Sequence, residues 1–135
     1  MGYYSYFMFR IKNGTKVDKE KAKKLEQFFK DENNYEYVSG FYGVVLETKD
    51  DGVLEDIRIE EYYSKFSDDE LFAKSLSEVL ISGEVDLMFS GEDGISWGYK
   101  VTPNKVIEMM SVFLTMEEIK KVERFLGRTL FYMVW

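Results

Sequence analysis

The stretch YYSKFSDDELFAKSLSEVLISGEVDLMFSGEDGISWGYKVTPNK, residues 62–105, predicts a helix that leads directly into a β-hairpin. Residues 67–70 (SDDE) are typical of a capping box, in which the serine and glutamate side chains satisfy backbone amides at a helix start. Phe66 and Leu71 flank this box as a hydrophobic staple. Gly83 is expected to end the helix, because glycine tolerates a positive φ. The apolar side of the helix carries Leu71, Phe72, Leu76, Val79 and Leu80.

The second half of this stretch alternates apolar and polar residues with the period of a β-strand. The sequence GEDG at residues 91–94 is expected to reverse the chain between two strands. The side chains predicted to face inward are Val85, Leu87, Phe89, Ile95, Trp97 and Tyr99. The helix and the hairpin are therefore predicted to form the nucleus of one hydrophobic core.

The composition removes many catalytic mechanisms. The chain has 135 residues with no cysteine and no histidine. It therefore cannot form disulfides, thiolate nucleophiles, Ser–His pairs or zinc sites built from histidine or cysteine. Carboxylates, lysine, tyrosine and metal-bound water are still available for catalysis, but we expect no cofactor.

Length and hydrophobicity indicate one folded unit. With 45% hydrophobic and 17% aromatic residues, residues 1–135 are predicted to form a single α+β domain. No apolar run approaches the ~20 residues of a membrane span. The first residues lack the pattern of a signal peptide. We therefore expect a cytoplasmic protein that does not act at a membrane.

The charge is distributed unevenly along the chain. The net charge is −7, yet residues 1–30 carry eight Lys/Arg against three Asp/Glu, and residues 31–97 carry four against eighteen. One interpretation is that these charges only solvate the surface. The other is an acidic face suited to a basic partner protein.

The N-terminal third predicts a strand followed by a helix. Residues 3–12 (YYSYFMFRIK) are apolar enough to predict a central strand covered on both faces. Asp18 is expected to cap a helix that ends near Lys30, with Leu25, Phe28 and Phe29 facing inward. The lysines of this helix are interpreted as lying on its solvent-exposed side. The alternative is contact with nucleic-acid phosphates, against which the negative net charge argues.

Several further elements follow the first helix. Residues 44–48 and 53–63 are predicted to form a hairpin around the turn KDDG at residues 49–52, whereas residues 35–43 are ambiguous. Residues 106–114 are predicted to form a strand. A second capping box, TMEE, predicts a helix that ends at Gly127, before a last apolar strand over residues 129–135.

The predicted order of elements is β-α-β-β-α-β-β-β-α-β. It describes an α+β protein with about three helices packed on one face of a single, mainly antiparallel sheet. The first six elements have the βαββαβ succession of ferredoxin-like folds.

Clustered carboxylates and exposed aromatic rings are the candidate functional groups. Glu92, Asp93, Asp68 and Asp69 could hold Mg²⁺ in a metal-dependent hydrolase or nuclease, but acids at turns and helix starts usually serve local structure. Trp97 is interpreted as part of the core or of a cross-strand pair, with a recognition patch as the alternative, and the same holds for Tyr99. The pair Met109-Met110 either fills the core or provides an adaptable binding surface.

Some of these motifs resemble a group of small uncharacterised proteins encoded by bacteriophages and integrated mobile elements. The similar features are the opening MGYY, the pair Tyr62-Tyr63, the acidic helix start, and Gly91-Glu92 followed by WGYK at residues 97–100. The resemblance covers about the first three quarters of the chain. Where that pattern tends to have a histidine, this chain has Ser64-Lys65-Phe66, so a histidine-dependent activity would be absent.

The resemblance implies an accessory protein that acts in a bacterial host cytoplasm. We expect a non-enzymatic protein that binds and inhibits a host protein, such as an anti-CRISPR inhibitor of a nucleic-acid-binding nuclease, without binding nucleic acid directly. The alternatives are the metal-dependent hydrolase and a structural phage or immunity-type binding protein. The expected binding surface, acidic and aromatic, comprises Tyr62, Tyr63, Asp68, Asp69, Glu92, Asp93, Trp97 and Tyr99.

The end of the chain bears on assembly. Residues 130–135 (LFYMVW) are apolar or aromatic without interruption. An unpaired strand of this kind recruits other chains, so we expect it to dock on its own sheet or on a second subunit. The protein is accordingly expected to be a monomer or a homodimer.

Overall fold

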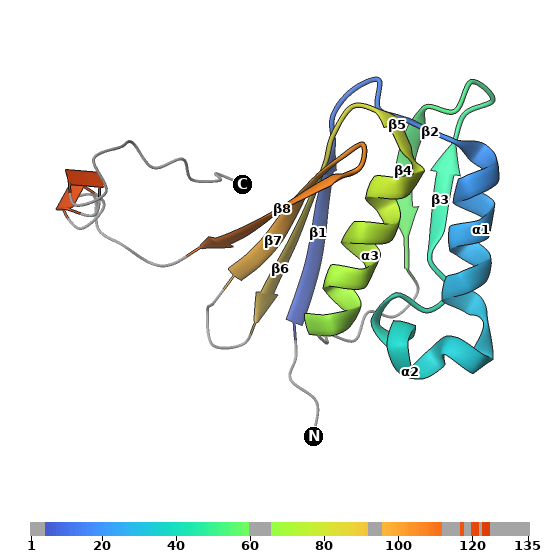
Figure 1. The fold of residues 1–135 in the computed structure, drawn as a ribbon, viewed down its shortest axis with the longest axis horizontal. Helices are drawn as coiled ribbons and strands as arrows, with labels where there is room; N and C mark the ends of the chain where they lie inside the picture. The colour runs from blue at the N-terminus through green and yellow to red at the C-terminus, as the bar shows by residue number, and fades with distance from the viewer. Residues whose placement is uncertain are drawn as a thin grey trace.

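The computed structural model describes residues 5–59, 66–91 and 96–111, together with Glu117, Lys120, Lys121, Glu123 and Arg124 (Figure 1). This part of the chain is α+β and its strands pair antiparallel. The helical elements are α1 (Lys19–Lys30), η1 (Glu32–Asn34), α2 (Tyr35–Val38), η2 (Ser39–Phe41) and α3 (Phe66–Val79), of which η1 and η2 are 3-10 turns. The strands are β1 (Ser5–Ile11), β2 (Lys16–Val17), β3 (Val45–Thr48), β4 (Leu54–Arg58), β5 (Leu80–Ser82), β6 (Val85–Gly91), β7 (Ser96–Thr102) and β8 (Lys105–Ser111).

The largest sheet has four strands in the order β1-β6-β7-β8. The predicted hairpin of β6 and β7 is confirmed, with Phe89 paired to Trp97 and Leu87 paired to Tyr99. Alternate residues of β6 face the core as predicted, since Val85, Leu87 and Phe89 are fully buried. We call the side of this sheet that packs on the core and on α3 the inner face, and the opposite side the outer face (Figure 1).

The prediction of a single sheet is wrong. The described strands form three sheets, because β2 pairs with β5 and β3 pairs with β4 as two separate two-stranded sheets. The β3–β4 hairpin lies beside α1 and is not hydrogen-bonded into the four-stranded sheet (Figure 1). In the described residues β1 pairs with β6 instead of with the strands that follow α1, so the ferredoxin-like arrangement is not formed.

The prediction that β1 is covered on both faces is also wrong, and within the described residues it is not a central strand. Its only strand partner in the described part of the chain is β6, so it lies at one end of the order. Phe7 and Phe9 pack against the core, whereas Met8, on the outer face, is 46% exposed. The apolar run predicted burial on both sides because methionine and phenylalanine are both hydrophobic. In the structure the phenylalanines face the core, whereas the methionine faces the other way.

Helix α1 confirms its predicted start. Asp18 is the N-cap, and its Oδ1 accepts hydrogen bonds from the amides of Glu20 and Lys21 at 3.0 and 3.1 Å. Leu25 and Phe29 are buried as predicted, but the inward assignment of Phe28 is wrong, since it is 43% exposed. One residue of an α-helix turns by about 100°, so Phe28 points away from the direction that Phe29 faces.

Helix α3 ends four residues earlier than predicted. It stops at Val79, and the next three residues form β5, which pairs with β2. Gly83 has the expected positive φ of +90°, but it lies in the turn between β5 and β6 rather than at the helix end. The helix also begins at Phe66, before the serine of the predicted capping box.

The ambiguous residues 35–43 form short helical turns that complete the core. Val38 and Phe41 are fully buried there. Phe41 stacks on Phe72 of α3 with ring centroids 4.2 Å apart, and Phe29 of α1 meets Phe72 edge-on at 5.6 Å. The core is therefore centred on aromatic rings from four different elements, the fourth being Phe89 of β6.

The remaining predictions are tested only in part. The hairpin of β3 and β4 and the strand β8 are confirmed, although β4 ends at Arg58. The five described residues between Glu117 and Arg124 have helical backbone, within the expected third helix. The full helix and the expected strand over residues 129–135 lie outside the described residues. None of the described helices is long and apolar enough to cross a membrane.

Candidate functional site

The structure divides the predicted site residues into two groups. Tyr62, Tyr63, Glu92 and Asp93 lie outside the described residues. Asp68 belongs to the first turn of α3, and its side chain also lies outside the description. The other three, Asp69, Trp97 and Tyr99, come together between α3 and β7, and all three are buried.

A hydrogen bond joins two of these residues across the core. Trp97 donates its indole Nε1–H to Asp69 Oδ2 at 3.1 Å, from β7 to the first turn of α3. Asp69 is fully buried and Trp97 is 6% exposed. Burying a carboxylate costs free energy unless it is paired, and this bond supplies one partner. The contact therefore fixes the position of α3 on the sheet.

Trp97 and Tyr99 belong to the core, so assigning them to an exposed binding surface is wrong. Trp97 stacks on Phe89 at 5.9 Å, and Tyr99 meets the same ring edge-on at 6.1 Å. Both aromatic side chains are only 6% exposed. The buried Asp69 is likewise no part of an acidic surface. The alternative interpretation of Trp97 and Tyr99, as core residues, is the one that the structure supports.

The buried position perturbs the ionisation of Tyr99. Burial raises the pKa of its phenol to about 12, and the nearby carboxylates of Asp69, Glu108 and Glu70 act in the same direction. A phenolate would be both desolvated and repelled at this place. Tyr99 is therefore neutral near pH 7 and unsuited to act as a general base.

We expect stability to fall above pH 10 through this residue. The folded pKa of Tyr99 is about 12 against 10.0 for a free phenol, so the folded state holds the proton where the unfolded state releases it. The stabilisation is complete below pH 10 and is lost as the pH rises to 12. Tyr99→Phe should therefore lose less stability than the original protein between pH 9 and pH 11 in urea unfolding. If the free energy of unfolding of the two proteins fell equally with pH, the raised pKa of Tyr99 would be contradicted.

The described residues give no support to a metal centre. They contain no group of three or more acidic side chains placed to hold an ion. Of the four carboxylates expected as ligands, only Asp69 has a described side chain, and it is bonded to Trp97.

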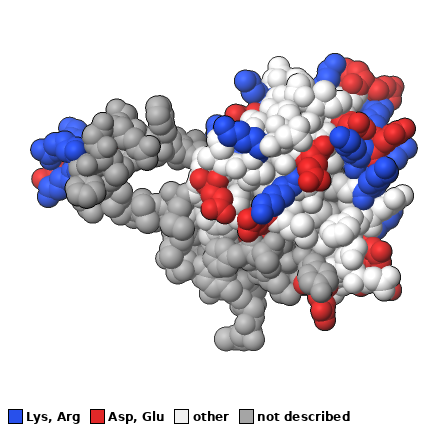
Figure 2. All heavy atoms as spheres, viewed as in Figure 1, with Lys and Arg blue, Asp and Glu red and all other residues white. Residues whose placement is uncertain are grey.

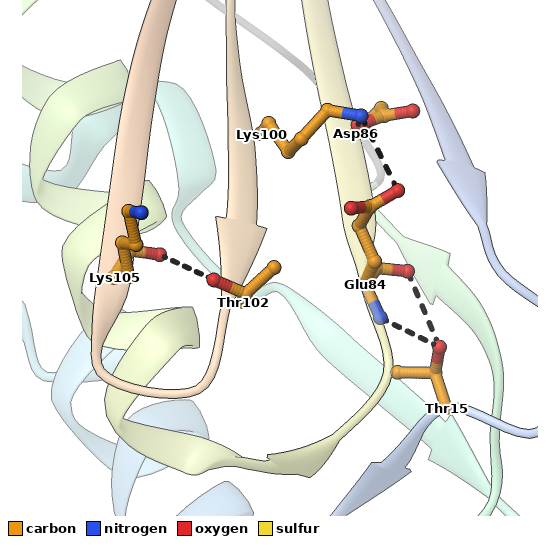
Figure 3. Close-up of polar contacts among 6 residues, drawn as sticks. All are labelled: Thr15, Glu84, Asp86, Lys100, Thr102 and Lys105. Atoms are coloured by element: carbon orange, nitrogen blue, oxygen red, sulfur yellow. Dashed lines mark hydrogen bonds and ion pairs between the residues drawn. The ribbon is translucent and has the colours of Figure 1, made fainter.

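The outer face of the four-stranded sheet carries a row of charges that the sequence analysis missed. In the strand register, Arg10 lies opposite Asp86 and Asp86 lies opposite Lys100. On the fourth strand, Ile107 lies opposite Lys100. Lys100 Nζ lies 3.3 Å from Glu84 Oε2 and 3.8 Å from Asp86 Oδ1 (Figure 3). Burial raises the pKa of Asp86, and the charge of Lys100 lowers it in opposition.

A row of methionines runs beside these charges on the same face. Met8, Met88, Gly98 and Met109 are paired in succession across the four strands. Met109 thus lies on the outer face, whereas the side chain of Met110 lies outside the description, so neither interpretation of the Met109-Met110 pair is tested. The period-two pattern of each strand was visible in the sequence, but the row depends on the register between strands that are far apart in the chain.

A surface with exposed aromatic rings lies where α1 passes into α2. Phe28 is 43% exposed and Tyr35 is 50% exposed, and Tyr35 is supported by the ring of Tyr42 at 5.2 Å. The carboxylates of Asp31, Glu32 and Glu36 are exposed among them. We call Phe28, Asp31, Glu32, Tyr35 and Glu36 the acidic-aromatic corner. Figure 2 shows acidic side chains and uncharged surface at the lower right, over α2.

Comparison with known proteins gives no relative for this chain, because no family model, no curated protein and no solved structure matches it.

Proposed function

We propose that this protein is a non-enzymatic inhibitor that binds a host protein. It would belong to the accessory proteins with which phages and mobile elements block bacterial defence, such as inhibitors of CRISPR nucleases, and it would act in the host cytoplasm. The observation that carries the proposal is the acidic-aromatic corner, where exposed rings lie among exposed carboxylates.

The chemistry of the corner suits a basic protein partner. Aromatic side chains supply much of the contact energy at interfaces, because one ring buries a large apolar area and loses little conformational entropy. Carboxylates around the rings would attract a positively charged surface and orient it. Nucleases carry such surfaces where they hold nucleic acid. The protein would compete with nucleic acid for that positively charged surface without binding nucleic acid itself.

The small choice of catalytic groups supports a binding role. The chain has no histidine or cysteine. Asp69 and Tyr99, two of the polar residues that a carboxylate or tyrosine mechanism could use, are buried in the core. We therefore propose that the side chains of Asp69 and Tyr99 stabilise the fold.

Binding can be tested by capture from bacterial lysates that contain defence nucleases. The immobilised full chain should retain a basic protein in stoichiometric amount. Glu36→Lys, in the acidic-aromatic corner, should weaken binding about tenfold or more, because it places a positive charge against a positive surface. Glu78→Lys, at an exposed position of α3, changes the net charge equally and should bind as the original does.

Two results would overturn the proposal. One is that no protein is retained from such lysates. The other is that Glu36→Lys and Glu78→Lys behave alike, which would place the binding surface elsewhere. A melting temperature that rises with millimolar Mg²⁺ would instead favour the metal-dependent hydrolase, because a ligand that binds only the folded state stabilises it.

A further inference from the structure

We propose that Asn13 is a site of spontaneous backbone modification, at which the amide nitrogen of Gly14 closes a succinimide ring that opens to aspartate or isoaspartate. Asn13 and Gly14 lie between β1 and β2, in a turn closed by a hydrogen bond from the amide of Thr15 to the carbonyl of Lys12 at 3.1 Å. The inference concerns the chemistry of this turn and does not depend on the proposed function.

The reaction needs only the chain and water. The backbone nitrogen of Gly14 forms a bond to Cγ of Asn13, the bond from Cγ to Nδ2 breaks, and the amide proton leaves with Nδ2 as ammonia. Water then opens the ring, and the nitrogen of Gly14 regains a proton. Opening at Cγ gives aspartate, whereas opening at the main-chain carbonyl gives isoaspartate, whose main chain runs through Cβ and Cγ. Asparagine is for this reason among the thermally labile residues of proteins.

Both reacting groups are accessible in the turn. Asn13 and Gly14 are exposed, and in the described part of the chain neither the Asn13 side chain nor the Gly14 amide makes a hydrogen bond. A Cβ at Gly14 would meet nothing within 4 Å, so the turn has room to bring the nitrogen to Cγ. Glycine also has no side chain that would hinder this approach. The exposed Lys12 and Lys16 flank the turn in the sequence, and their charges favour the anion that forms as the amide loses its proton.

The turn at Asp51-Gly52 shows the opposite arrangement. An aspartate before glycine can close the same ring with loss of water. Here, however, the amide of Gly52 donates to the carbonyl of Lys49 at 2.9 Å, and Gly52 is buried. The carboxylate of Asp51 accepts from the amide of Val53 at 3.1 Å. The attacking nitrogen and the carbon that it would attack are therefore both held in place, unlike those of the Asn13 turn.

The remaining asparagines are less reactive for other reasons. The amide of Asn34, which would attack Asn33, donates to the carbonyl of Asp31 at 2.9 Å. The side chain of Asn34 is itself bonded to a main-chain carbonyl at 3.3 Å. Asn104 is exposed, but Lys105 follows it with a side chain that hinders the attack. Asn104 therefore serves as an internal control for Asn13 within the same chain.

The modification would reach the core through Thr15, which follows the turn directly and is fully buried. The hydroxyl of Thr15 accepts from the amide of Glu84 at 3.1 Å (Figure 3), and its carbonyl accepts from the amide of Leu54 at 2.8 Å. Isoaspartate lengthens the main chain between Lys12 and Thr15 by a carbon atom. The bond that closes the turn and the bonds of Thr15 cannot then all keep their geometry, so the isoaspartate form should be less stable than the original protein.

Peptide mapping by mass spectrometry measures the reaction in the full chain, aged for several weeks in mildly alkaline buffer at a temperature where it stays folded. Residue 13 should lose ammonia about tenfold faster than Asn104 or more. An isoaspartyl methyltransferase should methylate part of the product. Asn13→Gln should slow the loss of ammonia at this position about tenfold or more, because the longer side chain must close a larger ring.

The effect on stability is measured on the aged form, which carries one more negative charge and is separated by ion exchange. Its isoaspartate fraction should melt at a lower temperature than the unaged chain. Freshly purified Asn13→Asp is the matched control, because it has the same charge without the longer main chain. It should melt as the original protein does.

Three results would overturn the inference. The first is that residue 13 keeps its amide throughout, and the second is that Asn104 reacts equally fast. The third is that residue 13 reacts only when the chain is unfolded in urea, because the folded turn would then protect Asn13. An isoaspartate form that melts with the original protein would overturn the proposed effect on Thr15.

Discussion

Replacing Phe72 with alanine is expected to lower the free energy of unfolding by about 3–5 kcal/mol, because the ring is buried in the centre of the core. Phe72 stacks on Phe41 with an interplanar angle of 8° and meets Phe29 edge-on at 5.6 Å. The substitution removes the contact that joins α3 to both the first helix and η2. Since domains of this size are stable by about 5–15 kcal/mol, the variant should be only marginally folded.

Urea unfolding followed by circular dichroism measures this loss. Phe28→Ala is the control, because Phe28 lies on α1 next to the core but is 43% exposed. Its loss should be below about 1.5 kcal/mol, because much of the ring is already in water. Equal losses for the two variants would show that the aromatic cluster does not hold the helices together as described.

Replacing Gly83 with alanine is expected to destabilise the protein by about 3 kcal/mol or more, from backbone strain and a clash together. The φ of Gly83 is +90°, where residues with a Cβ are strained. An added Cβ would also collide with the hydroxyl of Thr15 and lie 2.6 Å from its Cα. Thr15 is fully buried, so it has no room to move aside.

The clash would break a junction between distant segments. The Thr15 hydroxyl donates to the carbonyl of Lys12 at 2.6 Å. The same hydroxyl accepts from the amide of Glu84 at 3.1 Å (Figure 3). Its carbonyl accepts from the amide of Leu54 at 2.8 Å. One residue thus connects the end of β1, the start of β6 and the start of β4.

Gly14→Ala separates strain from collision. Gly14 has a similar φ of +84°, but an added Cβ would meet nothing within 4 Å. Its replacement should therefore show only the conformational cost, about 1–2 kcal/mol. The difference between the two variants in urea unfolding measures the contribution of the Thr15 junction. No difference would mean that the loop around Gly83 adapts without cost.

The elements that local sequence specifies were predictable. The Asp18 cap of α1 and the turn at residues 49–52 depend on a few neighbouring residues, and the structure contains both of them. The β6–β7 hairpin followed from alternation over a short span. Each of these signals acts within one turn or one strand, so the rest of the chain does not change it.

Strand partners and exposure were not predictable in the same way. The residues of β1 fit a central strand as well as an end strand, because hydropathy does not say which strand lies alongside. The short pair β2–β5 joins residues more than sixty positions apart, with two and three residues in its strands. Such short strands have no pattern of their own and form only because the surrounding segments place them together.

The candidate site shows the same limit. An acidic residue near a helix start, such as Asp69, was expected at the surface, and only the register of β7 brings it to the indole of Trp97. The acidic-aromatic corner was missed because residues 35–43 had no periodicity that could be interpreted. Its signal in the sequence was the tyrosine excess and the run Asp31-Glu32 directly after an amphipathic helix.

The pairing of β1 with β6 also affects how the protein folds during synthesis. Ile11 pairs with Val85, so the first strand is made long before its partner exists. At about 5–20 residues per second, a ribosome needs roughly 4–15 s to add the intervening chain. During that time the aromatic residues of the first strand have no sheet to join and are open to chaperones or to other nascent chains. Contacts this distant in sequence also slow folding, because a long loop must close before they form. Translation speed over residues 12–84 is therefore expected to influence the yield of folded protein more than codon choice after residue 91.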